Sequence, residues 1–136
     1  PDGNLITAHT ALSDLAARYP QARPFVPCAG TAHFGLSFAD TFQQYAVAAR
    51  FGQERLESVL VFFCPIGEDT SWEAWTEERE LQRRQEFDQW LDKQLGSAPC
   101  TVQTSAAGKC RRFAWGSAGA YYHKQDGGTA IIVSYC

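Results

Sequence analysis

Two runs of residues that favour β-structure lie near the C-terminus and are separated by one short turn. The runs are "RRFAWGSAGAYYH" at 111–123 and "TAIIVSY" at 129–135, and "KQDGG" connects them. An Asp-Gly pair between two such runs is a strong signal for a β-hairpin. Gly116 and Gly119 interrupt the first run and indicate a bulge or the close approach of another backbone. This hairpin constrains the fold more than any other segment.

Three earlier segments also predict regular structure. Residues 56–64, "LESVLVFFC", predict a strand covered on both faces or nearly so. Apolar residues at three- and four-residue steps predict helices over 5–19 and 37–51. Ser37 is a suitable N-cap for the second helix, and Asp40 resembles the acid of a capping box. A strand also fits residues 45–49, but the alanines and the cap favour the helix.

Residues 72–95 predict a third helix, with Thr70 or Ser71 as its N-cap. Its middle, "TEERELQRRQE", carries one apolar residue and predicts a solvated bridge with pairs such as Glu80–Arg84. Its last turns have an apolar face formed by Phe87, Trp90, Leu91 and Leu95. The order of elements predicts one α+β domain over 1–136. We expect a small antiparallel sheet of three or four strands, with about three helices packed against it and 31–35 adding an edge strand.

The five cysteines predict the compartment of this chain. None is spaced C-x-x-C, so the common redox and zinc motifs are missing. Cys100 and Cys110 border a turn that contains Gly and Ala and predict a local disulfide, and Cys64 and Cys136 would pair if the strands they end are neighbours. Cys28 would compete for Cys64 or stay free. Disulfides persist in oxidising compartments, so we expect a periplasmic or secreted protein; buried thiols in a cytosolic protein are the alternative.

Charge and hydropathy exclude two classes of partner. The net charge is −3 and the sequence pI is about 5.5, which argues against general nucleic-acid binding. No apolar run approaches the ~20 residues that a membrane-spanning helix needs. The chain begins at Pro1 and contains no methionine. A cleaved export signal would explain this start, and so would trimming of a longer chain.

The sequence offers one arrangement for catalysis. A Cys28–His33 pair would place a thiol near an imidazole, as in cysteine hydrolases, and a small secreted hydrolase is therefore the enzymatic alternative. Ser117 fails as a nucleophile elbow, because Trp115 stands where that motif needs glycine. Phosphate-binding loops and metal-ligand spacings are also missing. We therefore predict no catalytic residue, no cofactor and no metal.

An aromatic and acidic segment, "PIGEDTSWEAW" at 65–75, predicts a surface for another protein. Tryptophan, tyrosine and their charged neighbours are the residues that protein interfaces concentrate as hot spots. The acids would meet basic residues of the partner. A small-ligand-binding module with an aromatic pocket is a further alternative. The predicted partner-binding residues are Glu68, Asp69, Trp72, Glu73 and Trp75, with Tyr122 and His123 as a second patch.

The last part of the chain resembles the ends of small bacterial immunity proteins. The runs "FDQWLDKQLGSAPC" and "FAWGSAGAYYHKQDGGTAIIVSY" combine a helix closing in Leu-Gly, a strand starting at Trp-Gly and a final I-x-V-x-Y strand. The resemblance covers residues 87–136. It implies a non-enzymatic protein that inhibits a secreted toxin or effector enzyme by occluding its active site, and exported members of this class can carry disulfides. The first 86 residues contain nothing diagnostic, so the resemblance leaves the toxin open.

Overall fold

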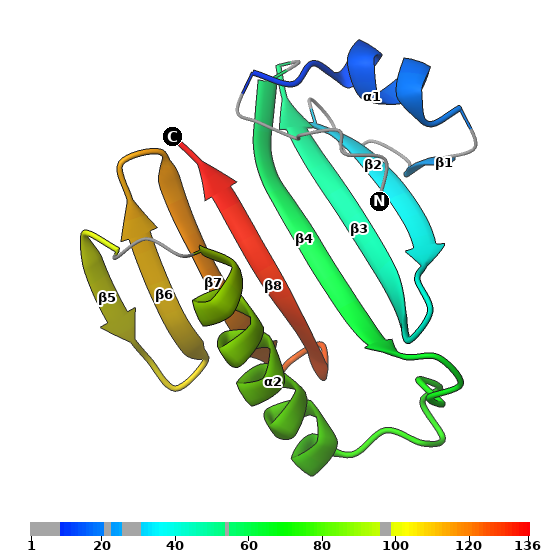
Figure 1. The fold of residues 1–136 in the computed structure, drawn as a ribbon, viewed down its shortest axis with the longest axis vertical. Helices are drawn as coiled ribbons and strands as arrows, with labels where there is room; N and C mark the ends of the chain where they lie inside the picture. The colour runs from blue at the N-terminus through cyan, green and yellow to red at the C-terminus, as the bar shows by residue number, and fades with distance from the viewer. Residues whose placement is uncertain (1–8, 21–22, 26–30, 54, 96–98) are drawn as a thin grey trace.

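Eight antiparallel strands form one sheet in the computed structural model, which describes residues 9–20, 23–25, 31–53, 55–95 and 99–136. The order of the strands across the sheet is β1-β2-β3-β4-β8-β7-β6-β5 (Figure 1). Two helices accompany them. The elements are α1 (Leu12–Arg18), β1 (Arg23–Phe25), β2 (Thr31–Ala39), β3 (Gln43–Gly52), β4 (Arg55–Pro65), α2 (Glu77–Leu95), β5 (Thr101–Thr104), β6 (Gly108–Phe113), β7 (Gly116–His123) and β8 (Gly128–Tyr135).

The α+β class is therefore confirmed, but the predicted numbers of strands and helices are wrong. The described residues contain eight strands rather than three or four, and two helices rather than three. The predicted helix over 5–19 is present only as α1, and residues 1–8 lie outside the described part of the chain. The predicted edge strand at 31–35 is part of β2, and β1 pairs with β2 beyond it.

The predicted helix over 37–51 is wrong, because these residues form the β2–β3 hairpin. Ser37 pairs with Ala46 across the hairpin. Asp40 closes the turn instead of capping a helix: its Oδ1 accepts hydrogen bonds from the backbone N–H groups of Phe42 (2.8 Å) and Gln43 (2.7 Å). A short acidic side chain serves a helix N-cap and a tight turn by the same kind of bond, so the local signal was ambiguous. The alternative strand at 45–49 is the correct one.

Two predicted strand regions are confirmed. Residues 56–64 lie within β4, but the expected cover on both faces is wrong: both helices pack on one face, and Leu60 on the other face is 38 % exposed. The C-terminal hairpin forms between β7 and β8, and Gly127 in its turn has a φ of 65°, which favours glycine over residues with a side chain. The first run of that hairpin is broken at Gly116, whose φ is 147°, so its earlier part becomes the separate strand β6. Gly116 thus marks a reversal of the chain rather than a bulge. The expected close approach of another backbone is confirmed, because a Cβ at Gly116 would meet the carbonyl oxygen of Ser134.

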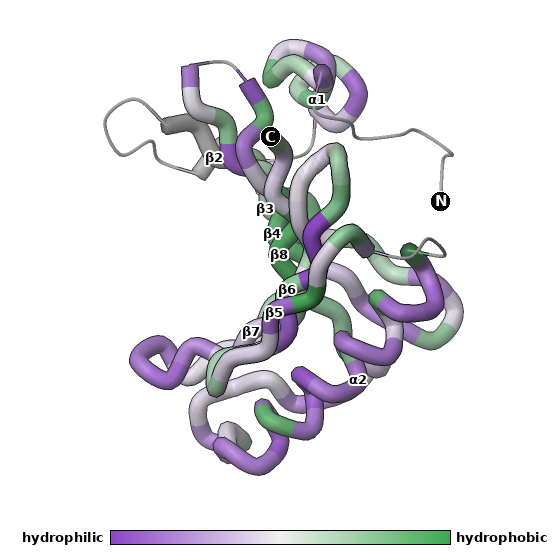
Figure 2. Tube along the Cα trace, turned by 90° about the vertical axis from the view of Figure 1, so that its left-hand side faces the viewer, coloured by the Kyte–Doolittle hydropathy of each residue, from purple (hydrophilic) through white to green (hydrophobic). Residues whose placement is uncertain are grey.

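Both helices cover the same face of the sheet. Leu15 of α1 belongs to one buried cluster with Phe34, Ala49, Phe51, Leu56 and Val59, and Phe87 and Leu91 of α2 belong to a second with Phe63, Ala118, Ala120 and Ile131. Val61 and Val133 pack against both clusters, which places the clusters side by side. Figure 2 shows the sheet nearly edge-on, with α2 along one side of it. Neither described helix is long and apolar enough to cross a membrane.

The sheet opens at one end between β4 and β8. These strands pair only from Ser58–Ser134 to Val61–Ile131, although β4 continues to Pro65 and β8 begins at Gly128. Figure 1 shows the two strands diverging toward the end where α2 begins. The segment that follows β4 and the first turns of α2 border this opening. The candidate site described below lies there.

The predicted disulfides are not formed, and the strand register explains why. The four described cysteines are unpaired, and Cys28 lies outside the described residues. Cys110 stands opposite Gln103, three residues from Cys100, which is about 10 Å at strand spacing and too far for a disulfide. Cys64 and Cys136 do end neighbouring strands, but the strands are antiparallel. Their ends therefore lie on the order of 25 Å apart.

Alkylation tests this arrangement of thiols. Iodoacetamide added to the native, unreduced protein should label the exposed Cys100 and Cys136 first. Cys64 is 1 % exposed, so it should react only after denaturation, without any reductant. Peptide mapping by mass spectrometry identifies the labelled positions. A peptide pair linked through Cys100 and Cys110 would contradict the β5–β6 register.

Candidate functional site

A cavity of about 300 Å³ lies where the sheet opens. Three segments that are distant in sequence surround it: the connection from β4 to α2, the first turns of α2 and the turn between β7 and β8. Its lining consists of Phe62, Asp69, Thr70, Ser71, Trp72, Ala74, Trp75, Thr76, Arg79, Glu80, Arg83, Asp126, Gly127, Gly128 and Thr129. We refer to it as the tryptophan cavity.

Local hydrogen bonds shape the connection before α2. Asp69 Oδ1 accepts a hydrogen bond from the Ser71 backbone N–H at 2.9 Å. Hydrogen bonds from the side chain and the backbone of Ser71 hold the pKa of Asp69 below its usual value of 3.8, so this carboxylate is charged at neutral pH. Thr76 then caps the helix, because its Oγ1 accepts a bond from the Arg79 N–H at 3.2 Å. The predicted start of the helix at residue 72 is therefore wrong: α2 begins at Glu77.

The two tryptophans of this connection lie against each other at the mouth of the cavity. Their ring centroids are 6.2 Å apart and the ring planes are tilted by 44°. Trp75 is fixed, since its Nε1–H donates to the carbonyl oxygen of Gly127 at 2.6 Å. Trp72 is 73 % exposed and Trp75 is 39 % exposed. A large aromatic surface is thus held in place and left open to solvent.

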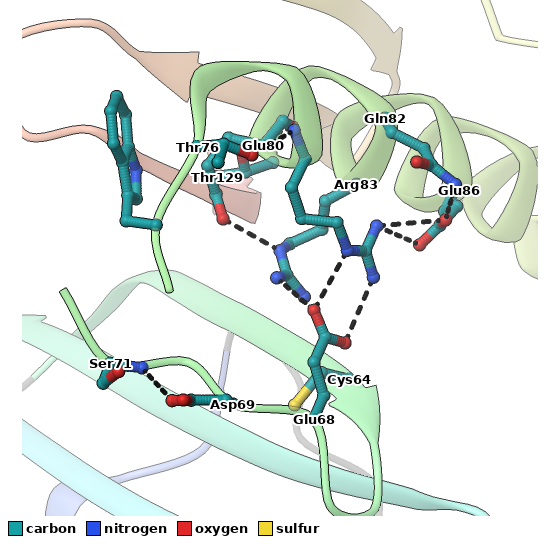
Figure 3. Close-up of polar contacts among 12 residues, drawn as sticks. Cys64, Glu68, Asp69, Ser71, Thr76, Glu80, Gln82, Arg83, Glu86 and Thr129 are labelled. Atoms are coloured by element: carbon teal, nitrogen blue, oxygen red, sulfur yellow. Dashed lines mark hydrogen bonds and ion pairs between the residues drawn. The ribbon is translucent and has the colours of Figure 1, made fainter. Parts of the chain in front are cut away.

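A network of ion pairs forms the wall behind the tryptophans. Arg79 donates from Nε and Nη2 to the two carboxylate oxygens of Glu68, at 3.0 and 3.1 Å. Arg83 reaches Glu68 from Nη2 at 2.7 Å and Glu80 from Nε at 3.2 Å. Arg79 also pairs with Glu86 at 3.1 Å. Figure 3 shows this network joining the helix to the segment after β4. It holds that segment and α2 together.

Arg83 is the most buried member of the network. Its side chain is 3 % exposed, and its guanidinium carbon lies 4.9 Å from the centroid of the Phe62 ring, a cation–π contact. Its Nη1 is buried and has no hydrogen-bond partner among the described residues. The predicted solvated bridge in the middle of α2 is therefore wrong. Glu80 pairs with Arg83 rather than Arg84, and Arg84 instead donates to the carbonyl oxygen of Ala106.

Glu68 links this network to pH. Burial alone would raise the pKa of its carboxyl, but hydrogen bonds from Arg79 and Arg83 outweigh burial and hold the pKa below 4.5. A group whose pKa is lower in the folded state contributes stability above its unfolded pKa and loses it as the pH falls through the folded pKa.

Replacing Glu68 with glutamine tests this linkage. Glu68→Gln should lower the free energy of unfolding by about 2 kcal/mol at pH 7, because hydrogen bonds to a charged acceptor become bonds to a neutral one. The difference from wild type should shrink as the pH falls below 4.5, the ordinary pKa of the carboxyl. Urea unfolding of both proteins at several pH values measures this difference in the free energy of unfolding. Glu57→Gln, which removes an exposed pair with Arg50, serves as the control. A pH-independent difference at Glu68 would contradict the assignment.

The structure brings together only some of the predicted partner-binding residues. Asp69, Trp72 and Trp75 line the tryptophan cavity, and Glu73 is exposed beside them. The Glu68 carboxylate is held by the two arginines inside the wall. Glu68 therefore holds the segment after β4 to α2.

The second predicted patch lines a neighbouring cavity rather than the same one. Tyr122 is 8 % exposed and donates from its hydroxyl to Glu77 at 3.4 Å, whereas His123 is exposed. Asp126 lines both cavities, so the two lie on either side of the β7–β8 turn.

Arg79, Arg83 and Asp126 belong to the site but were not predicted. The Glu80–Arg83 spacing was visible in the sequence, yet the contact that buries Arg83 comes from Glu68, fifteen residues away and outside the helix. Asp126 was interpreted only as a turn residue. For the enzymatic alternative, Cys28 lies outside the described residues, and His33 is described only as a backbone position in β2. No group of three or more His, Cys, Asp or Glu side chains in the described residues could hold a metal ion.

Comparisons with known proteins do not identify a relative. No family model matches the chain, and no curated protein or solved structure matches it either. The resemblance of residues 87–136 to immunity proteins thus stays a prediction. The geometry of the tryptophan cavity is therefore the observation that bears on function.

Proposed function

We propose that this chain is a non-enzymatic binding protein that engages another protein through the surface around Trp72 and Trp75. The observation that carries the proposal is the exposure of Trp72, at 73 %, beside a second tryptophan fixed by a hydrogen bond to Gly127. An exposed tryptophan of this size normally marks an interaction site rather than a structural one. Acidic side chains at Asp69, Glu73 and Asp126 surround the pair and form a polar rim.

The rigidity of this surface favours binding. Asp69 and Thr76 close the connection at its two ends, and the ion pairs of Glu68 tie it to α2. A surface that is ordered before binding loses less conformational entropy when the partner arrives. Binding through these ordered tryptophans therefore costs less entropy than binding through side chains on a mobile loop. More of the free energy gained by burying them appears as affinity.

The partner that we propose is a toxic enzyme whose active site this surface occludes. The exposed tryptophans line the cavity at the end of the sheet where β4 and β8 diverge, and an exposed aromatic pair there suits contact with the groups around a partner's active site. The resemblance of the C-terminal third to immunity proteins supports the same class of partner. Export to the periplasm or the cell exterior is part of this proposal and rests on that resemblance, because the disulfide pairs that first predicted it are not formed.

Quantitative affinity capture tests the proposed surface. Immobilised wild-type protein is compared with the double variant Trp72→Ala/Trp75→Ala and with Trp115→Ala, which removes another exposed tryptophan at 42 % exposure. We expect a protein that wild type and Trp115→Ala retain equally, and that the double variant loses at least about 30-fold, the effect of about 2 kcal/mol at a hot spot. Its identity as an enzyme is then checked by inhibition of its activity. Equal capture by all three proteins would overturn the proposed function.

A further inference from the structure

The charges around the tryptophan cavity favour a positively charged occupant. The two arginines of its lining are already neutralised, since Arg79 and Arg83 pair with Glu68, Glu80 and Glu86. The remaining charged lining residues are Asp69 and Asp126, both of which are exposed carboxylates. An anion entering the cavity would meet these acids, whereas a cation would be attracted by them.

The tryptophans supply a second attraction for a cation. A Lys or Arg group within about 6 Å of an indole ring is drawn to the negative face of that ring, and tryptophan is the best aromatic partner for it. The exposed ring of Trp72 and the fixed ring of Trp75 both line the cavity that Asp69 and Asp126 border. Two tryptophan rings and two carboxylates therefore line the tryptophan cavity together.

The floor of the cavity does not oppose a cation. Arg83 lines it with a side chain that is 3 % exposed, and Glu68 and Glu80 neutralise its charge. Its Nη1 lacks a hydrogen-bond partner among the described residues but is closed off from solvent, so an acceptor of the partner cannot reach it. Figure 3 shows Arg83 between Glu68 and Glu80, with Asp69 and Ser71 on the segment that faces the helix.

We propose that the tryptophan cavity binds a lysine or arginine side chain of the partner, with Trp72, Trp75, Asp69 and Asp126 holding its charge. The inference rests on the proposed function and names the chemistry of the partner: a basic residue on an exposed loop. An acidic or purely apolar loop would not satisfy these groups.

Short peptides test the charge that the cavity prefers. Acetyl-Gly-Lys-Gly-amide is titrated into isotope-labelled protein, and binding is followed by the NMR signals of the tryptophan indole N–H groups. Two matched peptides replace lysine with norleucine, which keeps the stem and removes the charge, or with glutamate. We expect the lysine peptide to bind at least about fivefold more tightly than the norleucine peptide and the glutamate peptide not to bind. Equal binding of lysine and norleucine, tightest binding of glutamate, or no binding of any peptide at about 20 mM would overturn the inference.

Variants of this chain test whether Asp69 and Asp126 cause the preference for a positively charged peptide. The double variant Asp69→Asn/Asp126→Asn keeps side chains that suit turns and removes both charges. The double variant should weaken lysine-peptide binding about fivefold. Glu57→Gln should leave this binding unchanged, because Glu57 pairs with Arg50 on β3 and does not line the cavity.

The two proposals fail in different ways. A captured partner that depends on Trp72 and Trp75, but binds the Asp69→Asn/Asp126→Asn variant as well as wild type, would overturn the basic-residue inference alone. Lysine-peptide binding without any tryptophan-dependent protein partner would overturn the proposed function alone.

Discussion

Replacing Arg83 with methionine should lower the free energy of unfolding by about 3 kcal/mol or more. Methionine keeps much of the aliphatic stem but removes the guanidinium, which lies over the Phe62 ring and pairs with Glu68 and Glu80. Glu80 is 8 % exposed and has no other ion pair among the described residues, so its carboxylate would stay buried without a cation. Removing one partner of a buried pair costs far more than removing an exposed pair.

Urea unfolding at pH 7 measures this loss. Arg50→Met is the matched control, because Arg50 and Glu57 are each about half exposed and their pair should contribute less than about 1 kcal/mol. A loss at Arg83 no larger than the loss at Arg50 would show that the network contributes nothing to the fold. The ion pairs could then not be what keeps the tryptophan cavity rigid.

Truncating Phe87 to alanine should also cost about 3–5 kcal/mol. Phe87 is fully buried, and its ring centroid lies 4.5 Å from that of Phe63 and 6.0 Å from that of Phe62. It therefore joins α2 to the end of β4, where the sheet opens and β8 no longer pairs with β4. Its cluster also contains Ala118, Ala120 and Ile131 of β7 and β8, so its truncation leaves a cavity in the core between α2 and the sheet.

Phe42→Ala provides the control for Phe87→Ala. Phe42 is 78 % exposed in the β2–β3 turn, and its truncation should change the free energy of unfolding by no more than about 0.5 kcal/mol. Chemical denaturation of both variants gives the two values. A loss below about 1 kcal/mol at Phe87 would contradict the packing of α2 on the sheet.

The sequence predicted those elements whose signals are local and strong. The Asp-Gly turn gave the β7–β8 hairpin, the apolar run at 56–64 gave β4, and the spacing of Phe87 and Leu91 gave the buried face of α2. Each of these signals lies within one element. The α+β class followed from them.

The remaining part of the fold depends on contacts between distant segments or on ambiguous local signals. Alanines in β3 weakened its strand signal, and Asp40 suits a helix cap as well as the turn that it makes. The predicted disulfides failed because neither the direction of β4 and β8 nor the register of β5 and β6 can be read from the cysteines alone.

The site was predicted in part for the same reason. Trp72 and Trp75 stood out by residue type in a polar segment, and the structure leaves both open to solvent. The wall behind them did not stand out, because Arg83 is surrounded in the sequence by charged residues typical of an exposed helix. Only the position of Glu68 across the opening shows that this arginine is buried.

Photo-crosslinking in living cells shows whether a partner binds at Trp72 and Trp75. A photoreactive amino acid replaces the exposed Glu73, beside the tryptophan cavity, and the matched control carries it in place of Trp115 at the opposite end of the C-terminal hairpin. We expect a crosslinked protein of one defined mass from position 73 that is absent from position 115. A crosslink from position 115 and none from position 73 would show that the partner binds elsewhere and that the tryptophan cavity is not the binding surface.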